Sequence, residues 1–334
     1  MKFSLRRVLV VMLFGVLLYG GYAVYSGLGR VRDALTGYAW WTFAAACALA
    51  FGNYILRFLK WEFYLSRLEI RGVKKLDSFL VFLSGFVLTI SPGKVGEVFK
   101  SFVLHETYEV DMTRTAPIIV AERVTDVLGI VVLIVLGSLG FEGGLVWAGV
   151  GAALVAMLIG VVMSQTLSLR LIGFVEVLPG PFKKIGAKAR AAYVSLRTLL
   201  SPRNLVAPTL ISFCAWTLEC LALWIIVRGF GEPVSVPLAT FFYATSTLAG
   251  AIIPVPGGLG VTETLLNGQM HDIGHVSPAA ATGAMMLVRF ATLWFAVLVG
   301  FVALTLLKRR FPGLLAEEAK PSAAPAEAEP PAEA

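Results

Sequence analysis

Charged side chains interrupt an apolar segment of this sequence, and their types suit anion binding. Glu122, Arg123 and Asp126 lie inside the apolar run 117–136. Glu122 and Asp126 are four residues apart and Arg123 precedes Asp126 by three, so a helix brings them together. A guanidinium group donates two parallel hydrogen bonds to a phosphate, which makes Arg123 a candidate phosphate ligand. The other interpretation is an internal salt bridge that stabilises packed helices.

Arg289 occupies a comparable position later in the chain. Arg123 follows Gly96 by 27 residues, and Arg289 follows Gly260 by 29 residues. A helix rises about 1.5 Å per residue, so each arginine would lie roughly 15 Å along its own helix. Charges at that depth of a membrane face protein or water rather than lipid. We therefore expect both arginines to point to one internal site.

Two Pro-Gly segments interrupt the apolar runs that precede these arginines. They are Ser91-Pro92-Gly93-Lys94-Val95-Gly96-Glu97 and Pro256-Gly257-Gly258-Leu259-Gly260. Proline has no amide hydrogen and glycine tolerates most backbone angles, so each segment predicts a broken helix. The helix that restarts after the break offers free amides to an anion. Lys94 would add to this attraction, whereas the alternative for Lys94 and Lys100 is extension to the membrane surface.

The remaining candidates surround these breaks and arginines. The glycines would let the backbone approach a ligand, or simply form tight turns. Glu219 would pair with Arg289 or carry a coupling proton, and Arg57 would bind ligand or anchor its helix at the membrane interface. The substrate-binding candidates are Arg57, Pro92, Gly93, Lys94, Gly96, Arg123, Pro256, Gly257, Gly258, Gly260 and Arg289. The candidates for charge balance or proton coupling are Glu97, Glu122, Asp126, Glu219 and Glu263.

Composition places these residues in a membrane protein. The 334 residues are 57% hydrophobic and 15% charged, whereas soluble domains carry about 25% charged residues. The net charge of +7 is concentrated in loops beside apolar runs, which is typical of cytoplasmic loops rather than of a nucleic-acid surface. We therefore expect an integral membrane protein that binds no nucleic acid.

The apolar runs predict an all-α polytopic membrane protein with about six full transmembrane helices and two re-entrant helical hairpins. The apolar arm 76–90 is 15 residues long, about 22 Å as a helix, which is too short for a bilayer core of roughly 30 Å. We therefore expect the hairpins to enter and leave on one side. The predicted spans are 8–28, 38–59, 116–140, 143–165, 205–228 and 278–307, and the hairpins are 76–107 and 238–271.

Loop charges predict the orientation of this architecture. With both termini cytoplasmic, the basic stretch 57–75 (which includes Lys60), the linker 166–204 and residues 308–310 all lie inside. Three spans separate the hairpins, so the hairpins enter from opposite faces, as in an inverted repeat of about 38–140 and 205–307. The transmembrane domain covers 1–310, and the basic linker includes an amphipathic helix. The Ala/Glu/Pro tail 311–334 is predicted to be disordered.

Motifs for other chemistries are missing from the sequence. It has no Gly-x-x-x-x-Gly-Lys-Ser/Thr loop for a nucleotide and no His-Glu-x-x-His zinc helix. His271, Asp272 and His275 lie near one another without a further ligand. Cys47, Cys214 and Cys220 lie in apolar runs and predict no disulfide framework. We expect no enzyme activity, no cofactor and no metal site.

Three segments together resemble a known family. Ser91–Glu97, Ala121–Asp126 and Pro256–Glu263, together with Asn53, Arg57 and Trp61, resemble the lysylphosphatidylglycerol-synthase transmembrane family. This is the flippase-like domain of multiple-peptide-resistance proteins, and the resemblance covers roughly residues 5–310. It implies a domain that moves or binds a lipid between leaflets. Full-length synthases add a soluble aminoacyltransferase domain, which we expect this chain to lack.

We therefore predict a lipid flippase or lipid transporter of the inner (cell) membrane. Its substrate would be a phospholipid, a polyprenyl-phosphate-linked lipid or a hopanoid-type lipid. The alternative is a non-catalytic membrane partner that recruits or regulates a lipid- or glycan-modifying enzyme. A membrane-embedded transferase acting on polyprenyl phosphates ranks last, because no activating base accompanies a metal-binding acid pair. Neither the lipid nor the oligomeric state follows from the sequence.

Overall fold

The computed structural model describes residues 35–90, 95–163, 196–253 and 255–315, with isolated positions 13, 17, 21 and 32. These residues form helices and turns, with no β-strand among them. The order is α3 (Trp41–Arg67), α4 (Lys75–Ser84), η1 (Gly85–Leu88), α5 (Val95–Tyr108), α6 (Met112–Ser138), α7 (Gly144–Met163), α10 (Pro202–Gly229), α11 (Val236–Ile252), η3 (Pro256–Gly258), α12 (Val261–Asp272), α13 (Pro278–Arg289), η4 (Phe290–Trp294) and α14 (Phe295–Arg310). Most of the predicted span 8–28, the break 91–94, most of the linker 166–204 and the tail from residue 316 lie outside the described residues.

Three helical runs of the described chain are long and apolar enough to cross a membrane. They are α3, α10 and the continuous run from α13 to α14, with mean hydropathy values of 1.4, 2.1 and 2.4. The charged helix α6 and the apolar helix α7 cover the predicted spans 116–140 and 143–165. The architecture is therefore all-helical, with helices of membrane-spanning length. The count of six spans remains a prediction.

Helix α3 is longer than predicted, and this corrects the position of Lys60. The sequence indicated a span ending near residue 59 followed by a basic loop, but the helix continues to Arg67. The last two turns stay helical because they carry an apolar face. Trp61 and Tyr64 are fully buried and Leu65 is 4% exposed. Lys60 is fully buried in the protein and does not lie in a loop.

Glycines let the central helices approach closely. A Cβ added to Gly129 of α6 would lie 2.9 Å from the backbone nitrogen of Phe213 in α10. One added to Gly137 would lie 2.6 Å from the nitrogen of Phe241 in α11. Small residues at such contacts permit the close backbone packing that is typical of membrane helices. Helix α6 is thereby held against the second half of the chain.

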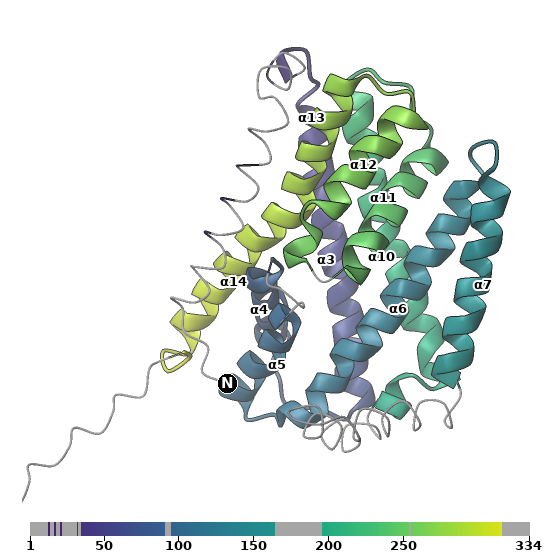
Figure 1. The fold of residues 1–334 in the computed structure, drawn as a ribbon. Helices are drawn as coiled ribbons and strands as arrows, with labels where there is room; N and C mark the ends of the chain where they lie inside the picture. The colour runs from purple at the N-terminus through teal and green to yellow at the C-terminus, as the bar shows by residue number, and fades with distance from the viewer. Residues whose placement is uncertain are drawn as a thin grey trace, which may run out of the picture.

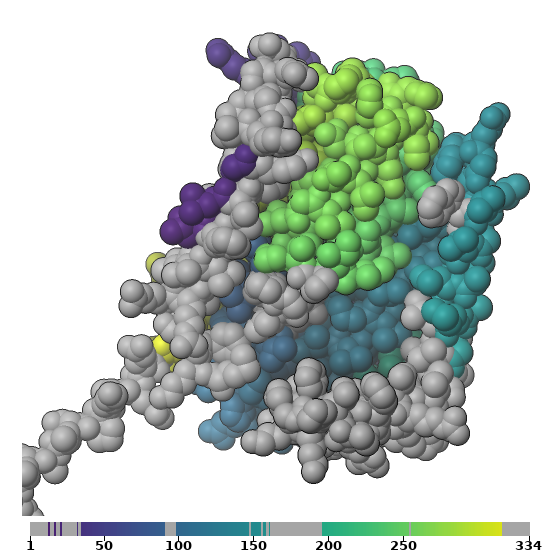
Figure 2. All heavy atoms as spheres, in the orientation of Figure 1, coloured from purple at the N-terminus to yellow at the C-terminus, as the bar shows by residue number. Residues whose placement is uncertain are grey.

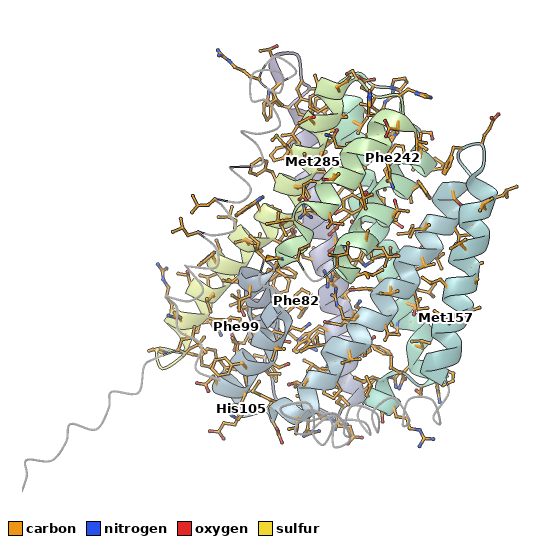
Figure 3. The ribbon with its side chains drawn as sticks, viewed as in Figure 1. Phe82, Phe99, His105, Met157, Phe242 and Met285 are labelled. Carbon is orange, nitrogen blue, oxygen red and sulfur yellow. The ribbon has the colours of Figure 1, made fainter. Side chains whose placement is uncertain are left out.

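Two apolar cores divide the described molecule. One includes Phe82 of α4 and Phe99 of α5, which pack with α3 and α14. The other includes Phe242 of α11 and Met285 of α13, which pack with α10 and α12. Figure 3 shows the first pair low in the view and the second pair high. The functional residues described below lie between these cores.

Two pairs of short helices face each other across the middle of the molecule. Figure 1 shows α4 and α5 in the lower half and α11 and α12 in the upper half, and Figure 2 shows α11–α13 as a closely packed face above the blue atoms of the first half. The described parts of the two pairs meet, because a Cβ on Gly257 would lie 3.6 Å from the Cα of Ile90. Ile90 packs there with Leu293 and Val297. In the sequence, each pair coincides with one of the segments predicted to form a re-entrant hairpin, 76–107 and 238–271.

Candidate functional site

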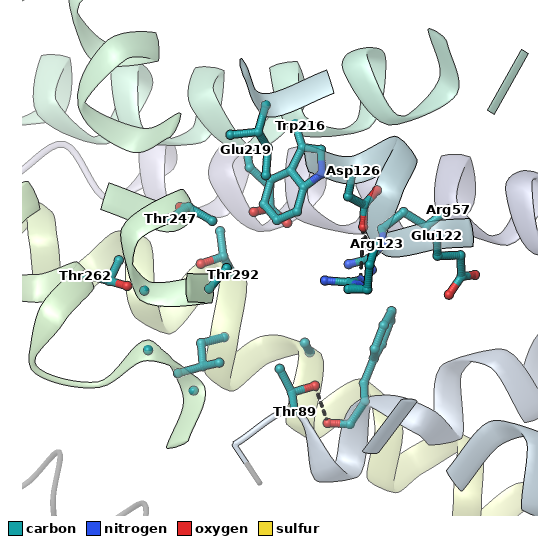
Figure 4. A pocket seen from close by; sticks show the side chains of 18 of the residues that line it. Arg57, Thr89, Glu122, Arg123, Asp126, Trp216, Glu219, Thr247, Thr262 and Thr292 are labelled. Carbon is teal, nitrogen blue, oxygen red and sulfur yellow. Dashed lines mark hydrogen bonds and ion pairs between the residues drawn. The ribbon is translucent and has the colours of Figure 1, made fainter. Parts of the chain in front are cut away.

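A cavity of about 440 Å³ lies where the two helix pairs meet. Its walls come from α3, α4 and η1, α6, α10, α11, η3, α13 and η4, with single residues from α5, α12 and α14. Figure 4 shows Arg57, Glu122, Arg123 and Asp126 at one end, Thr247, Thr262 and Thr292 at the other, and Trp216 and Glu219 between them. The cavity therefore has a charged end and a hydroxyl-rich end.

Asp126 gathers three cations at the charged end. Its carboxylate lies 2.5 Å from Lys60 Nζ, 3.0 Å from Arg123 Nη2 and 3.4 Å from Arg57 Nη2. Ser212 donates a hydrogen bond of 2.9 Å to the same carboxylate. Within the described residues, three cations therefore share this one carboxylate. Buried charges at membrane depth are costly, and shared pairing lowers that cost.

The two arginines of this cluster reach the cavity while their carboxylate partner stays behind them. The side chains of Arg123 and Arg57 are 28% and 16% exposed, and that of Asp126 is 3% exposed. The Arg57 guanidinium also lies 5.9 Å from the ring centre of Trp216. A ligand in the cavity can therefore contact the guanidinium groups without displacing the pairing that holds them.

Lys100 forms a second buried pair beside this cluster. Its ammonium group binds the carboxylate of Glu122 and lies 4.7 Å from the ring centre of Trp61 and 5.5 Å from that of Phe82. Lys100 is 5% exposed, so it does not extend to the membrane surface. The aromatic faces stabilise the ammonium group inside the protein. Both Lys100 and Glu122 line the cavity.

Arg289 stabilises the backbone of the second break, residues 256–260. Its Nε lies 2.6 Å from Glu263 Oε1, and its Nη2 donates a 2.7 Å hydrogen bond to the carbonyl of Gly257. Glu263 in turn accepts a 2.7 Å hydrogen bond from the amide of Gly260. Glu263 therefore caps an amide at the start of α12. Arg289 pairs with Glu263, rather than with Glu219 as one sequence interpretation expected.

The glycines of this break are required by its backbone. Gly257, Gly258 and Gly260 have φ values of 60°, 70° and 85°, which L-residues with a side chain rarely adopt. Gly257 and Gly258 also line the cavity. The break is therefore both a tight turn and a wall of the site.

Glu219 differs from the other carboxylates of the cavity. Asp126, Glu122 and the nearby Glu263 all have cationic partners. The observed partner of Glu219 is the hydroxyl of Tyr243, which donates a 2.6 Å hydrogen bond to it. The residue is 6% exposed and lines the cavity.

The structure brings together most of the predicted residues that it describes. The cavity is lined by Arg57, Glu122, Arg123, Asp126, Glu219, Gly257, Gly258 and Arg289. Pro256, Gly260 and Glu263 belong to the adjoining turn and helix start. Pro92, Gly93 and Lys94 lie outside the described residues, and for Gly96 and Glu97 only the backbone, which is in α5, is described.

Sequence reasoning missed Lys60 and Trp216. Lys60 follows Arg57 by three residues, so helical spacing could have placed both on one face of an extended α3. Trp216 is 9% exposed, and its indole N–H has no acceptor among the described residues. No local signal distinguished Trp216 from the other aromatic residues of an apolar span.

The chain is similar to a family of membrane domains and to archaeal membrane proteins. A family model described as the lysylphosphatidylglycerol synthase TM region matches residues 10–300. A UPF0104 membrane protein of Methanothermobacter thermautotrophicus is 24% identical over 322 residues, which cover 88% of this chain and 94% of that protein. A UPF0104 membrane protein of Pyrococcus horikoshii is 22% identical over 270 residues, which cover 72% and 80% of the two chains.

Proposed function

Because the chain belongs to the lysylphosphatidylglycerol synthase TM region family, we propose that it moves a phosphate-bearing lipid between the leaflets of a cell membrane. The observation that carries this proposal is the cavity where the two helix pairs meet, with the partly exposed side chains of Arg57 and Arg123 in its wall. Its volume of about 440 Å³ suits a headgroup and is too small for two acyl chains as well. The chains would stay in lipid during transfer.

Arg57, Arg123 and Trp216 would hold the phosphate. Both side chains line the cavity and are partly exposed, and a guanidinium group suits phosphate oxygens. The indole N–H of Trp216 is a buried donor without an acceptor among the described residues, and a phosphate oxygen would supply one.

Arg289 would act mainly on the backbone of the second break. It lines the cavity, but its Nε and Nη2 contact Glu263 and the Gly257 carbonyl. We propose that this bracing keeps the break beside the headgroup, and that Arg289 contributes long-range attraction to the phosphate. The threonine hydroxyls at the far end would contact the polar substituent of the headgroup.

The membrane arrangement that goes with this function has six spans, two re-entrant hairpins and both termini in the cytoplasm. Hairpins entering from opposite leaflets would present the same cavity to each leaflet in turn, as in transporters built from inverted repeats. The meeting of Gly257 with Ile90 at the centre of the molecule supports this arrangement. We propose that the protein carries out no covalent chemistry and that its partners are membrane lipids.

Reconstitution in liposomes tests this function. A fluorescent phosphatidylglycerol is distributed over both leaflets, and a membrane-impermeant reductant reports how fast the inner pool becomes accessible. We expect Arg123→Ala to slow transfer about tenfold or more, because a hydrogen bond to a charged group contributes roughly 1.5–3 kcal/mol. Arg123→Lys should be intermediate, since it keeps the charge and loses the fork.

Arg67→Ala is the matched control for this experiment. Arg67 ends α3, is exposed, and lies over Phe63 rather than in the cavity. It should transfer lipid at the wild-type rate. Folding of each variant is checked by its unfolding temperature in detergent. Wild-type transfer by folded Arg123→Ala, or no transfer by the wild type, would refute the proposal.

A further inference from the structure

Glu219 is a buried carboxylate on the cavity wall whose observed partner is a hydroxyl rather than a cation. An ionised carboxylate at membrane depth is costly when no cation pairs with it. The Tyr243 hydroxyl donates a 2.6 Å hydrogen bond to one oxygen, which lowers that cost without cancelling the charge. Glu219 can therefore exchange between a neutral and an ionised form at a smaller cost than its paired neighbours.

The groups around Glu219 connect it to the phosphate end of the cavity. Tyr54 and Arg57 face it from α3, Asp126 from α6, Tyr243 from α11 and Arg289 from α13, with Cys220 beside it on α10. Arg57 is shared between this carboxylate and the proposed phosphate position. Asp126 and Arg289 are committed to the pairs described above.

We propose that Glu219 is a proton-binding site that is filled together with the anionic headgroup, which rests on the proposed function. A phosphate held by Arg57 and Arg123 adds negative charge near Glu219 and withdraws the positive charge of Arg57 from it. Both effects favour the protonated carboxyl group. By thermodynamic reciprocity, protonation of Glu219 strengthens headgroup binding by the same factor.

The expected coupling is large enough to measure. A unit charge roughly 10 Å away in a protein interior changes a proton-binding constant about tenfold. The negative charge of the lipid and the positive charge of the proton on Glu219 would then cancel, so the transfer would move no net charge across the membrane. The geometry thus links proton uptake to the binding of a monoanionic lipid, and acidic pH should tighten headgroup binding about tenfold.

Calorimetry of the full chain in detergent tests this coupling directly. Short-chain phosphatidylglycerol, whose phosphodiester does not titrate near neutral pH, is titrated at several pH values between about 5 and 8. At each pH, two buffers with different ionisation heats give the number of protons taken up per lipid bound. With a tenfold coupling, the wild type should take up at most about half a proton per lipid bound, with the maximum at one intermediate pH. Glu219→Gln should take up none and bind with the tighter, acid-form affinity at every pH.

Two further variants separate a coupling role from a structural one. Tyr243→Phe removes the hydroxyl that favours the ionised form, so the pH at which binding weakens should rise. If Glu219→Gln unfolds, this shift alone tests the site. Glu106→Gln, an exposed carboxylate of α5 outside the cavity, should leave both proton uptake and affinity unchanged.

The outcomes distinguish the two proposals. Phosphatidylglycerol that binds no better than a short-chain diacylglycerol, which lacks the phosphate, would refute the phosphate site and the coupling with it. Tight phosphatidylglycerol binding without proton uptake would leave the proposed function intact and overturn the role of Glu219. Proton uptake that persists in Glu219→Gln would overturn it as well.

Discussion

Individual residues of the cavity differ in exposure: some are buried in contacts with one another, and others are partly exposed to the cavity. Lys60, Asp126 and Ser212 bind one another at 2.5–2.9 Å and are buried. Arg57 and Arg123 are anchored by the same carboxylate yet partly exposed. The anchoring fixes their orientation before a ligand arrives, which lowers the entropy lost on binding.

Trp216 offers a test of a single hydrogen-bond donor. Trp216→Phe keeps an aromatic ring beneath Arg57 but removes the indole N–H donor and part of the ring system. We expect phosphatidylglycerol to bind about tenfold or more weakly, because the lost hydrogen bond is to a charged group. Any fall in the unfolding temperature should reflect only the lost ring volume, since that N–H has no acceptor in the described protein. Calorimetry and thermal unfolding measure the two effects.

Trp224→Phe is the opposite case on the same helix. Trp224 donates a 3.1 Å hydrogen bond to the carbonyl of Val234 and lies outside the cavity. Its replacement should lower the unfolding temperature and leave lipid affinity unchanged. If Trp216→Phe behaves like Trp224→Phe, the indole of Trp216 serves packing and not the headgroup.

At the scale of elements, the second break is the part of the described chain that depends most on its exact residues. Three glycines with positive φ form the turn, and Arg289 binds both its carbonyl and the acid of the following helix. The turn also contacts the other helix pair near Ile90. A distortion here would move the cavity wall and the contact between the two helix pairs together.

Gly257→Ala tests this dependence. At φ of 60° an alanine costs about 1–2 kcal/mol, and its Cβ would lie against Ile90 and Leu293. We expect a lower unfolding temperature in detergent and slower lipid transfer in liposomes. Gly37→Ala is the control, because Gly37 has nothing within 4 Å of an added Cβ and no positive φ. Equal stability of the two variants would show that the turn is not under this constraint.

The sequence predicted where the residues of this site lie better than it predicted which ion pairs they form. The Pro-Gly segment indicated the second break, and charges within an apolar run indicated Glu122, Arg123 and Asp126. The partner of Asp126 is 66 residues away in Lys60, and the partner of Arg289 proved to be Glu263 and not Glu219. Such pairings depend on how helices pack, which periodicity within one segment does not contain. Lys60 was misplaced because a basic residue after an apolar run resembles the start of a loop.

At the scale of the whole molecule, two apolar cores flank the cavity that contains the charged side chains. The first core holds α4 and α5 against α3 and α14, and the second holds α11 and α12 against α10 and α13. Helices α3 and α13–α14 run past both, as Figure 1 shows. Separate cores would let the two halves shift against each other while each stays packed, and the cavity lies where such a shift would open it.

Photolabelling tests the central claim, that a lipid phosphate group occupies the cavity between the helix pairs. A phospholipid with a photoreactive group on its headgroup is incorporated in proteoliposomes and activated, and the labelled peptides are mapped. We predict labelling of cavity-lining positions on α3, α6 and α10, near Arg57, Arg123 and Trp216, that falls sharply in Arg123→Ala. Labelling confined to the outer, lipid-facing surfaces, with no change in Arg123→Ala, would contradict the account.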